Sequence, residues 1–304
     1  MVEFGMVDAS AGVHRAGWSI LAVLVLVALV SSAAAGELKR QPRGSPFEAS
    51  TSDESRRNAL SAIPYRQLEP QQRGKVDQVL TNVSVFRRMP IRLVECDPEL
   101  YLFLLRHPDV IVNIWEVLGI TQLQVRQGSD GRFRVADNAG VQGTLEILHQ
   151  SRETQLAYAE GAYEGPLSIR PAKGKALILM RSGYVQENDG RWYITTRMDC
   201  FLNIEPGATE LITKVLQPVV GNVADNNFIQ TVGFLGSLSR TAEANHHGVQ
   251  RLASRLQHVQ PELRQELSKM AERIGTAAWQ SVEDRPPADP PVIAAEQTIA
   301  PKRQ

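Results

Sequence analysis

Few residues in this 304-residue chain have the types and spacing that catalysis needs. Tyr158 and Glu160 are two positions apart, so they share one face of an expected strand. A carboxylate beside a cavity can act as a general base, which makes Glu160 a candidate, although a glutamate at the rim of a sheet has the same appearance in a sequence. Glu146 and His149 are three apart on another expected strand. They therefore face opposite sides and do not form an acid–base pair.

Other reactive side chains are arranged unfavourably for catalysis or metal binding. His246 and His247 are adjacent on an expected helix, where neighbours point about 100° apart and do not converge easily on one ion. The segment Ser182-Gly183-Tyr184 lacks the glycine pattern of a nucleophile elbow. The two cysteines form no C-x-x-C pair. We therefore predict no catalytic residue, no metal site and no cofactor.

Net charge argues against a nucleic-acid partner, and composition indicates a folded core. The chain has 33 Lys and Arg against 33 Asp and Glu, with a pI near 7.0, so it offers no broad basic surface. Binding along the nucleic-acid backbone depends on such a surface, and we expect no nucleic-acid partner. Hydrophobic residues make up 43% of the chain, enough for a sizeable core.

The N-terminus has the pattern of a secretory signal. His14 and Arg15 precede the uncharged run Trp18–Val30, which small residues follow up to Ala35. We predict a signal peptide over residues 1–35, cleaved after Ala35, and hence a periplasmic or secreted protein. The alternative is an uncleaved membrane anchor, because Trp18 to Ala35 is eighteen residues long, the lower limit of a span.

Composition divides the remaining chain into four parts. Residues 36–74 are polar and have no sustained hydrophobic period, which predicts a disordered linker. Residues 75–256 form the expected folded domain, and residues 257–281 an amphipathic helix. The proline-rich tail over residues 282–304 is expected to be disordered as well. Limited proteolysis should therefore leave a fragment of about Val76 to Trp279.

The order of expected elements indicates an α+β domain. A strand over Val83–Glu95, with Pro90 favouring an edge position, precedes two short helices over Pro98–Arg106 and Asp109–Leu118. Six strands with turn residues between them then predict an antiparallel meander: Thr121–Arg126, Arg132–Ala136, Val141–His149, Thr154–Tyr163, Lys175–Val185 and Arg191–Ile204. Alternation along the last strand predicts one buried and one solvated face. A helical turn over Ala208–Gln217 precedes helices from Pro218 towards Ser254 and over Pro261–Trp279.

This order resembles that of the START-like, or SRPBCC, superfamily over about Val83 to Ser254. The stretches Arg106-His107-Pro108-Asp109, Ile114-Trp115-Glu116-Val117-Leu118-Gly119 and Gly161-Ala162-Tyr163-Glu164-Gly165 are similar to those of exported bacterial members. The resemblance implies a curved antiparallel sheet of about seven strands gripping a long C-terminal helix. It also implies that the space between them often holds a hydrophobic ligand.

Three functions remain open. The leading one is a non-enzymatic exported domain that binds a hydrophobic small molecule through Tyr158, Met180, Ile194, Met198, Phe228, Val232 and Leu235. The second is an interaction protein with a filled core, whose C-terminal helix binds a partner or a second copy through Leu263, Leu267, Met270 and Ile274. The third is a cyclase-like or hydrolytic enzyme that uses Glu160, Tyr158 or Arg197. A ligand pocket should reach about 300 Å³, and an enzyme needs two polar side chains converging in it.

The two cysteines are expected to stay apart. In the START-like arrangement the first strand pairs antiparallel with the last, which places Cys96 near Arg191 or Trp192. Cys200 lies about eight residues further on, roughly 25 Å along a strand. A disulfide requires Cα atoms within about 7 Å, so we predict two free thiols.

Overall fold

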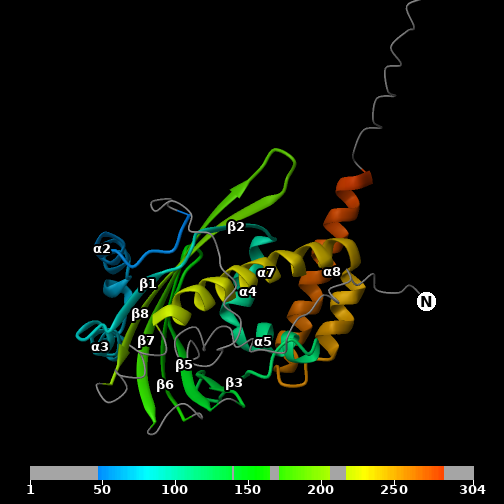
Figure 1. Cartoon of the computed structure of the whole chain (residues 1–304). Coiled ribbons are helices and arrows are strands. Elements are labelled where there is room, and N and C mark those ends of the chain that lie inside the picture. Colours follow the sequence, from blue (N-terminus) through cyan, green and yellow to red (C-terminus); the bar gives the residue numbers. More distant parts are fainter. Residues whose placement is uncertain (1–46, 139, 165–170, 206–216, 284–304) are drawn as a thin grey trace, which may run out of the picture.

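The computed structural model describes residues 47–138, 140–164, 171–205 and 217–283. One antiparallel sheet has the strand order β1-β8-β7-β6-β5-β4-β3, and β2 also pairs with β8 (Figure 1). Its strands are β1 (Val85–Arg88), β2 (Arg92–Glu95), β3 (Gln124–Gln127), β4 (Phe133–Ala136), β5 (Val141–Gln150), β6 (Thr154–Tyr163), β7 (Ala172–Gln186) and β8 (Trp192–Ile204). The helices are α2 (Asp53–Ser61), η1 (Tyr65–Gln67), α3 (Pro70–Leu80), α4 (Pro98–Arg106), α5 (Pro108–Val117), α7 (Gln217–Ser254) and α8 (Pro261–Glu283).

The sheet has two covered faces. The face towards α4, α5 and α7 is called the inner face, and the face towards α2 and α3 the outer face (Figure 1). The long helix α7 lies against the inner face before a kink at Asn245 (φ −154°, ψ 66°), so the predicted α+β fold, an antiparallel sheet with a long C-terminal helix against it, is confirmed.

The first expected strand is two strands, β1 and β2, which both pair with β8. The break lies at Met89-Pro90-Ile91, because Pro90 has no N–H to donate to the ladder. Met89 N donates to Met198 O at 2.8 Å, the last bond before the break. This division raises the expected seven strands to eight.

Short local signals fix the two helices that follow. The Asp97 carboxylate caps α4 by accepting from Leu100 N at 2.9 Å, and Pro98 occupies the first turn. Pro108 begins α5 in the same way, and Gly119 (φ 70°) follows its end in the left-handed conformation. Both helices bury large apolar side chains on the inner face of the sheet.

Gly236 allows α7 to approach β2 closely. A Cβ atom at this position would lie 2.5 Å from Val94 Cγ2 and 3.0 Å from Glu95 O. Asp97 N donates to Ser239 Oγ at 2.9 Å one turn further along, and Arg87 Nε donates to Asp225 Oδ1 at 2.9 Å nearer the start of the helix. Three points along α7 are thus fixed to β1, β2 and the turn after β2.

Residues 47–74 correct the prediction of a disordered linker over residues 36–74. They contain α2, η1 and the start of α3, and they pack on the outer face of the sheet. The buried residues there form an outer core of Ala59, Leu68, Val76, Val79, Phe86, Leu148, Leu156, Tyr158, Leu177, Leu179 and Phe201. The prediction that one face of β8 is solvated is therefore wrong where these helices cover it.

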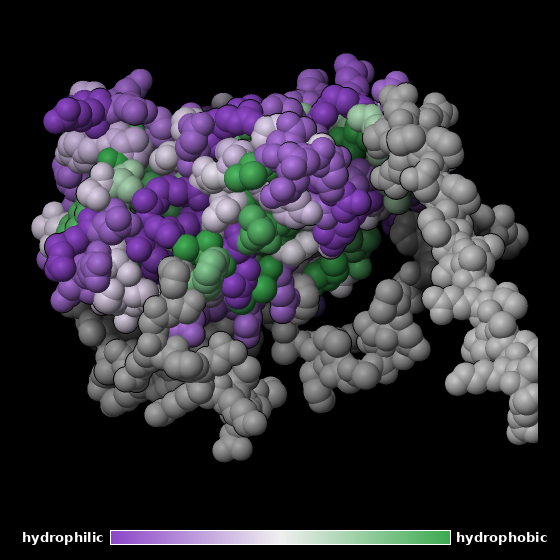
Figure 2. Space-filling view, turned by 90° about the horizontal axis from the view of Figure 1, so that it is seen from above, coloured by the Kyte–Doolittle hydropathy of each residue, from purple (hydrophilic) through white to green (hydrophobic). Residues whose placement is uncertain are grey.

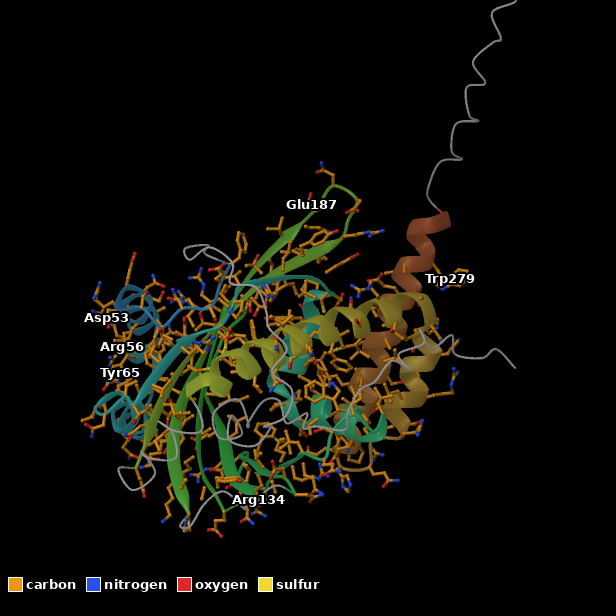
Figure 3. All side chains as sticks on the ribbon, in the orientation of Figure 1. Asp53, Arg56, Tyr65, Arg134, Glu187 and Trp279 are labelled. Atoms are coloured by element: carbon orange, nitrogen blue, oxygen red, sulfur yellow. The ribbon has the colours of Figure 1, made fainter. Side chains whose placement is uncertain are left out.

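The helix α8 is part of the folded unit and not a separate amphipathic segment. Its apolar side packs against α7 within the same chain, and Leu263, Leu267 and Ile274 are buried there, with Met270 packed beside them. These four residues were predicted to bind a partner, and that prediction is wrong for the three buried ones; Met270 is only partly buried. Trp279, at 63% exposed, points away from the body of the molecule instead (Figure 3).

Several predictions concern residues outside the described part of the chain: the signal peptide, the helical turn over Ala208–Gln217 as far as residue 216, and the tail from residue 284. In the part that the structure does describe, no helix has the length and hydropathy of a membrane span.

Candidate functional site

Six of the seven residues predicted to bind a ligand lie together in the core between the inner face and α7. Met180, Ile194 and Met198 come from the sheet, and Phe228, Val232 and Leu235 from α7. Each is at most 9% exposed. The alternation along β8 and the helical spacing along α7 therefore identified the surfaces that meet.

Tyr158 is the exception, because it lies on the outer face. Its neighbours Ala157 and Ala159 point inward, and Tyr158 packs in the outer core. Its hydroxyl donates to Glu160 Oε2 at 2.8 Å, and Lys75 Nζ lies 5.8 Å from the ring centroid. Burial and the Glu160 carboxylate raise the pKa of Tyr158, so the hydroxyl stays protonated at neutral pH. Tyr158 was predicted to bind a ligand between the sheet and the long helix, and the structure places it on the opposite face, together with the candidate base Glu160.

A pocket of about 720 Å³ lies on the outer face across β4 to β8. Alternation places its polar side chains on that face, and their charges are of both signs: Arg134, Thr144, Glu160, Lys173, Lys175, Asn203 and Glu205. Arg134 lies at the end of the molecule away from Glu187, which marks the tip of the β7–β8 hairpin (Figure 3). Glu160 and Lys175 are register partners, so the opposite charges neutralise one another across the strands.

The inner face has a floor of small residues beside the predicted site. On β6 the inward positions are Ala157, Ala159 and Gly161, and on β7 they are Ala172, Gly174 and Ala176. Ala159 pairs in register with Ala176 and Gly161 with Gly174, whereas Ala157 pairs with Ile178 and Ala172 with Tyr163. We call these six residues the small-residue floor.

A third glycine extends the floor onto β5. Gly143 pairs with Gly161, which pairs with Gly174. A Cβ atom on Gly143 would lie 2.6 Å from Glu160 O, so the strands approach too closely there for any side chain. Glycine within a strand often marks such an approach or a bend. The glycines leave the inner surface flat where most strands carry bulky side chains.

Tyr163 is the polar residue at the end of this floor. It lies two positions beyond Gly161 on β6 and therefore points inward. Its side chain is completely buried, and its hydroxyl has no hydrogen-bond partner among the residues that the structure describes. A buried hydroxyl without a partner costs about 1–3 kcal/mol. The hydroxyl is thus available to a molecule on the floor.

Sequence reasoning missed Tyr163 and the floor. The detectable signal was glycine or alanine at alternate positions of the expected strand Thr154–Tyr163 and again at Ala172, Gly174 and Ala176, which is unusual for a buried face. For metal binding, no group of three His, Cys, Asp or Glu side chains in the described ranges could hold an ion.

The sequence matches no family model and no curated protein. Solved structures show low similarity. A conserved protein from Geobacillus kaustophilus is 11% identical with a TM-score of 0.36, covering 49% of this chain and 93% of that one. A hypothetical protein from Helicobacter pylori is 14% identical with a TM-score of 0.30, covering 47% and 84%. A truncated norcoclaurine synthase from Thalictrum flavum is 11% identical with a TM-score of 0.29, covering 49% and 91%.

Proposed function

We propose that the protein binds an apolar small molecule that carries one hydrogen-bond acceptor, such as a carbonyl oxygen. The molecule lies on the small-residue floor, between the sheet and α7. Its acceptor faces Tyr163, and its apolar part extends towards Met180, Met198 and Phe228. The single observation that carries this proposal is the buried hydroxyl of Tyr163, which has no hydrogen-bond partner in the described part of the chain and lies at the end of a floor built from glycine and alanine.

The chemistry of the lining supports an adaptable apolar site. Methionine has a flexible, polarisable side chain that adjusts to ligands of different shape, and Met180 and Met198 are register partners on β7 and β8. A ligand acceptor would satisfy the Tyr163 hydroxyl in a low-dielectric environment, where a hydrogen bond fixes orientation. Small side chains on β6 and β7 give the ligand its room.

The test is a fluorescence titration with the neutral apolar probe N-phenyl-1-naphthylamine. The wild-type chain should bind it saturably at one site. Ala159→Leu places a bulky side chain on the floor and should weaken binding at least tenfold. Ala162→Leu is the matched control, because it makes the same change on the outer side of β6 and should leave binding unchanged.

A second variant keeps the test informative if Ala159→Leu fails to fold. Tyr163→Phe removes only the hydroxyl, so it should leave binding of the neutral probe intact and weaken binding of a carbonyl-containing competitor. Tyr193→Phe, on the outer side of β8, serves as its control. Equal probe binding by wild type and a folded Ala159→Leu variant would contradict the proposal.

We also propose that the protein is exported, on the strength of the N-terminal sequence pattern alone. Cleavage after Ala35 would leave a mature chain beginning at Gly36. Intact-mass measurement of protein from the exported fraction of its own host tests this, since retention of residues 1–35 would indicate an uncleaved anchor.

A further inference from the structure

Three arginines surround a single carboxylate on the outer face of the sheet. Arg88 of β1 is the register partner of Asp199 on β8, and Arg181 of β7 is the register partner of Arg197 on β8. All four side chains point outward, because the inward positions between them are Met180, Met198 and Cys200. The three arginines and the one aspartate together therefore carry a formal net charge of +2.

The Asp199 carboxylate accepts hydrogen bonds from two of the arginines, Arg88 and Arg181. It is completely buried, and it accepts hydrogen bonds from Arg88 Nε at 2.6 Å and from Arg181 Nη2 at 3.1 Å. Asn58 of α2 adds a neutral acceptor, since its Oδ1 accepts from Arg88 at 3.0 Å and from Arg181 at 3.2 Å. One carboxylate and one amide thus hold two guanidinium groups in place.

Arg197, the third arginine of the group, differs from Arg88 and Arg181 in its surroundings. Among the described residues it has no hydrogen-bond or ion-pair partner, although it is partly buried. It lies directly opposite Arg181, and like charges in this cross-strand position are destabilising. Arg181 Nε is also buried, and no described residue forms a hydrogen bond with it. Burial and the guanidinium groups of Arg88 and Arg181 lower the pKa of Arg197, and the Asp199 carboxylate opposes this effect only in part.

There is room for a ligand beside the two arginines. Gly183 follows Arg181 on the same face of β7, and a Cβ atom there would meet nothing within 4 Å. Its register partner Thr195 is exposed on β8. The two guanidinium groups therefore border an open, neutral part of the outer face.

We propose that Arg181 and Arg197 form a binding site for a phosphate-type dianion, with Arg88, Asp199 and Asn58 holding Arg181 in position. Guanidinium groups present planar forks of N–H donors that match the oxygens of phosphate. A phosphate group carries a charge of about −1.5 to −2 at neutral pH, which matches the excess of two positive charges. The phosphate is either free or part of a headgroup, because both present the same oxygens.

Calorimetric titration of the full chain with inorganic phosphate tests the site. The wild type should bind phosphate saturably, and Arg197→Gln and Arg181→Gln should each weaken binding at least tenfold. Arg251→Gln is the control, because Arg251 is exposed on α7, and it should bind as the wild type does. Absence of saturable binding by the wild type, or equal binding by Arg197→Gln, would overturn the proposal.

A thermal measurement distinguishes this site from a structural role of Arg197. In phosphate-free buffer Arg197→Gln should raise the Tm, because it removes repulsion without removing a partner. Added phosphate should then raise the Tm of the wild type and not that of the variant. A lower Tm of Arg197→Gln in phosphate-free buffer would show that groups within the chain hold Arg197, and would contradict the proposal.

Vesicle sedimentation separates the two sources of phosphate. Phosphatidylcholine vesicles containing phosphatidic acid should bind the wild type and not Arg197→Gln if the site takes a headgroup. Binding of inorganic phosphate without vesicle binding would assign the site to free phosphate. Failure of both assays would reject the site, and the inner-face proposal would be unaffected because it concerns the opposite side of the sheet.

Discussion

At the level of single residues, Asp109 on α5 has a buried carboxyl group. It is 1% exposed, and its Oδ1 has no partner among the described residues. Burial raises its pKa from 3.8 to about 6, so the fold favours the neutral form. Below pH 3.8 the carboxyl is protonated in both the folded and the unfolded chain, and its burial does not reduce the free energy of unfolding. As the pH rises through about 6 the buried carboxyl ionises, and that free energy falls.

Asp109→Asn should therefore stabilise the protein at pH 7 and have little effect at pH 3.5. At about 1.4 kcal/mol per pKa unit, the free energy of unfolding should rise by about 1–3 kcal/mol at pH 7. Urea unfolding at the two pH values measures this, with the exposed Asp130→Asn as control. A gain of equal size at both pH values would show that charge is not the cause.

The cysteines give a second prediction at this scale. Cys96 N donates to Trp192 O at 3.2 Å, and Cys200 is the register partner of Arg87, so the expected strand register is confirmed. Both thiols are free and buried, and burial raises the pKa of each to about 12. Thiol titration should find two free thiols after denaturation without reductant, and slow reaction in the native state. A titration that finds no free thiol would contradict the pairing of β1 and β2 with β8.

Residue patterns predicted the inner core well and the outer core poorly. Alternation assigned Ile194 and Met198 to the core because their strand has polar residues at many intervening positions. It failed for Tyr158 because β6 is covered on both sides, so apolar residues occur on both faces and the period of two is lost. The Tyr163 hydroxyl was not identifiable, because hydrogen-bond partners depend on the fold.

At the level of elements, α2 and α3 explain why the linker prediction was wrong. Each short helix buries only a narrow apolar stripe, and the rest of its surface is charged or polar. Average composition over residues 36–74 therefore resembles that of a disordered segment. Apart from Phe86 of β1, the apolar partners of the stripe on the sheet lie about 70 to 150 residues away on β5 to β8, where local sequence gives no indication of them.

Val76→Ala and Val79→Ala test whether α3 belongs to the cooperative unit. Both side chains are completely buried in the outer core. Removing two methyl groups should lower the free energy of unfolding by about 1–3 kcal/mol for each variant, in a single transition. The exposed Val185→Ala should change it by less than about 0.5 kcal/mol. A separate early transition would indicate that α3 unfolds independently of the sheet.

At the level of the whole molecule, the sheet, α7 and α8 form one continuous core, and the outer core lies on the opposite side of the sheet. Surface hydrophobic residues occur in small groups among hydrophilic ones on the side that contains the β7–β8 hairpin and β2 (Figure 2). Ion pairs join distant elements, as where Arg273 of α8 donates to the Asp97 carboxylate at 2.7 Å. The arrangement predicts a single proteolytic fragment.

Limited proteolysis should leave a fragment of about residues 47–283, in place of the Val76 to Trp279 fragment expected from composition. The reason is that α2 and α3 are packed on the sheet and α8 on α7, and packed backbone resists cleavage. Mass spectrometry of the resistant fragment locates its ends. Rapid cleavage between residues 53 and 80 would contradict the outer core.

The central claim concerns a ligand on the inner face, and native mass spectrometry of protein purified from its own host tests it most directly. The account predicts an added small mass at a ratio of one per chain, released by organic solvent and reduced in Ala159→Leu but retained in Ala162→Leu. Detection of the unliganded mass alone, together with no saturable binding of N-phenyl-1-naphthylamine to the same sample, would contradict it.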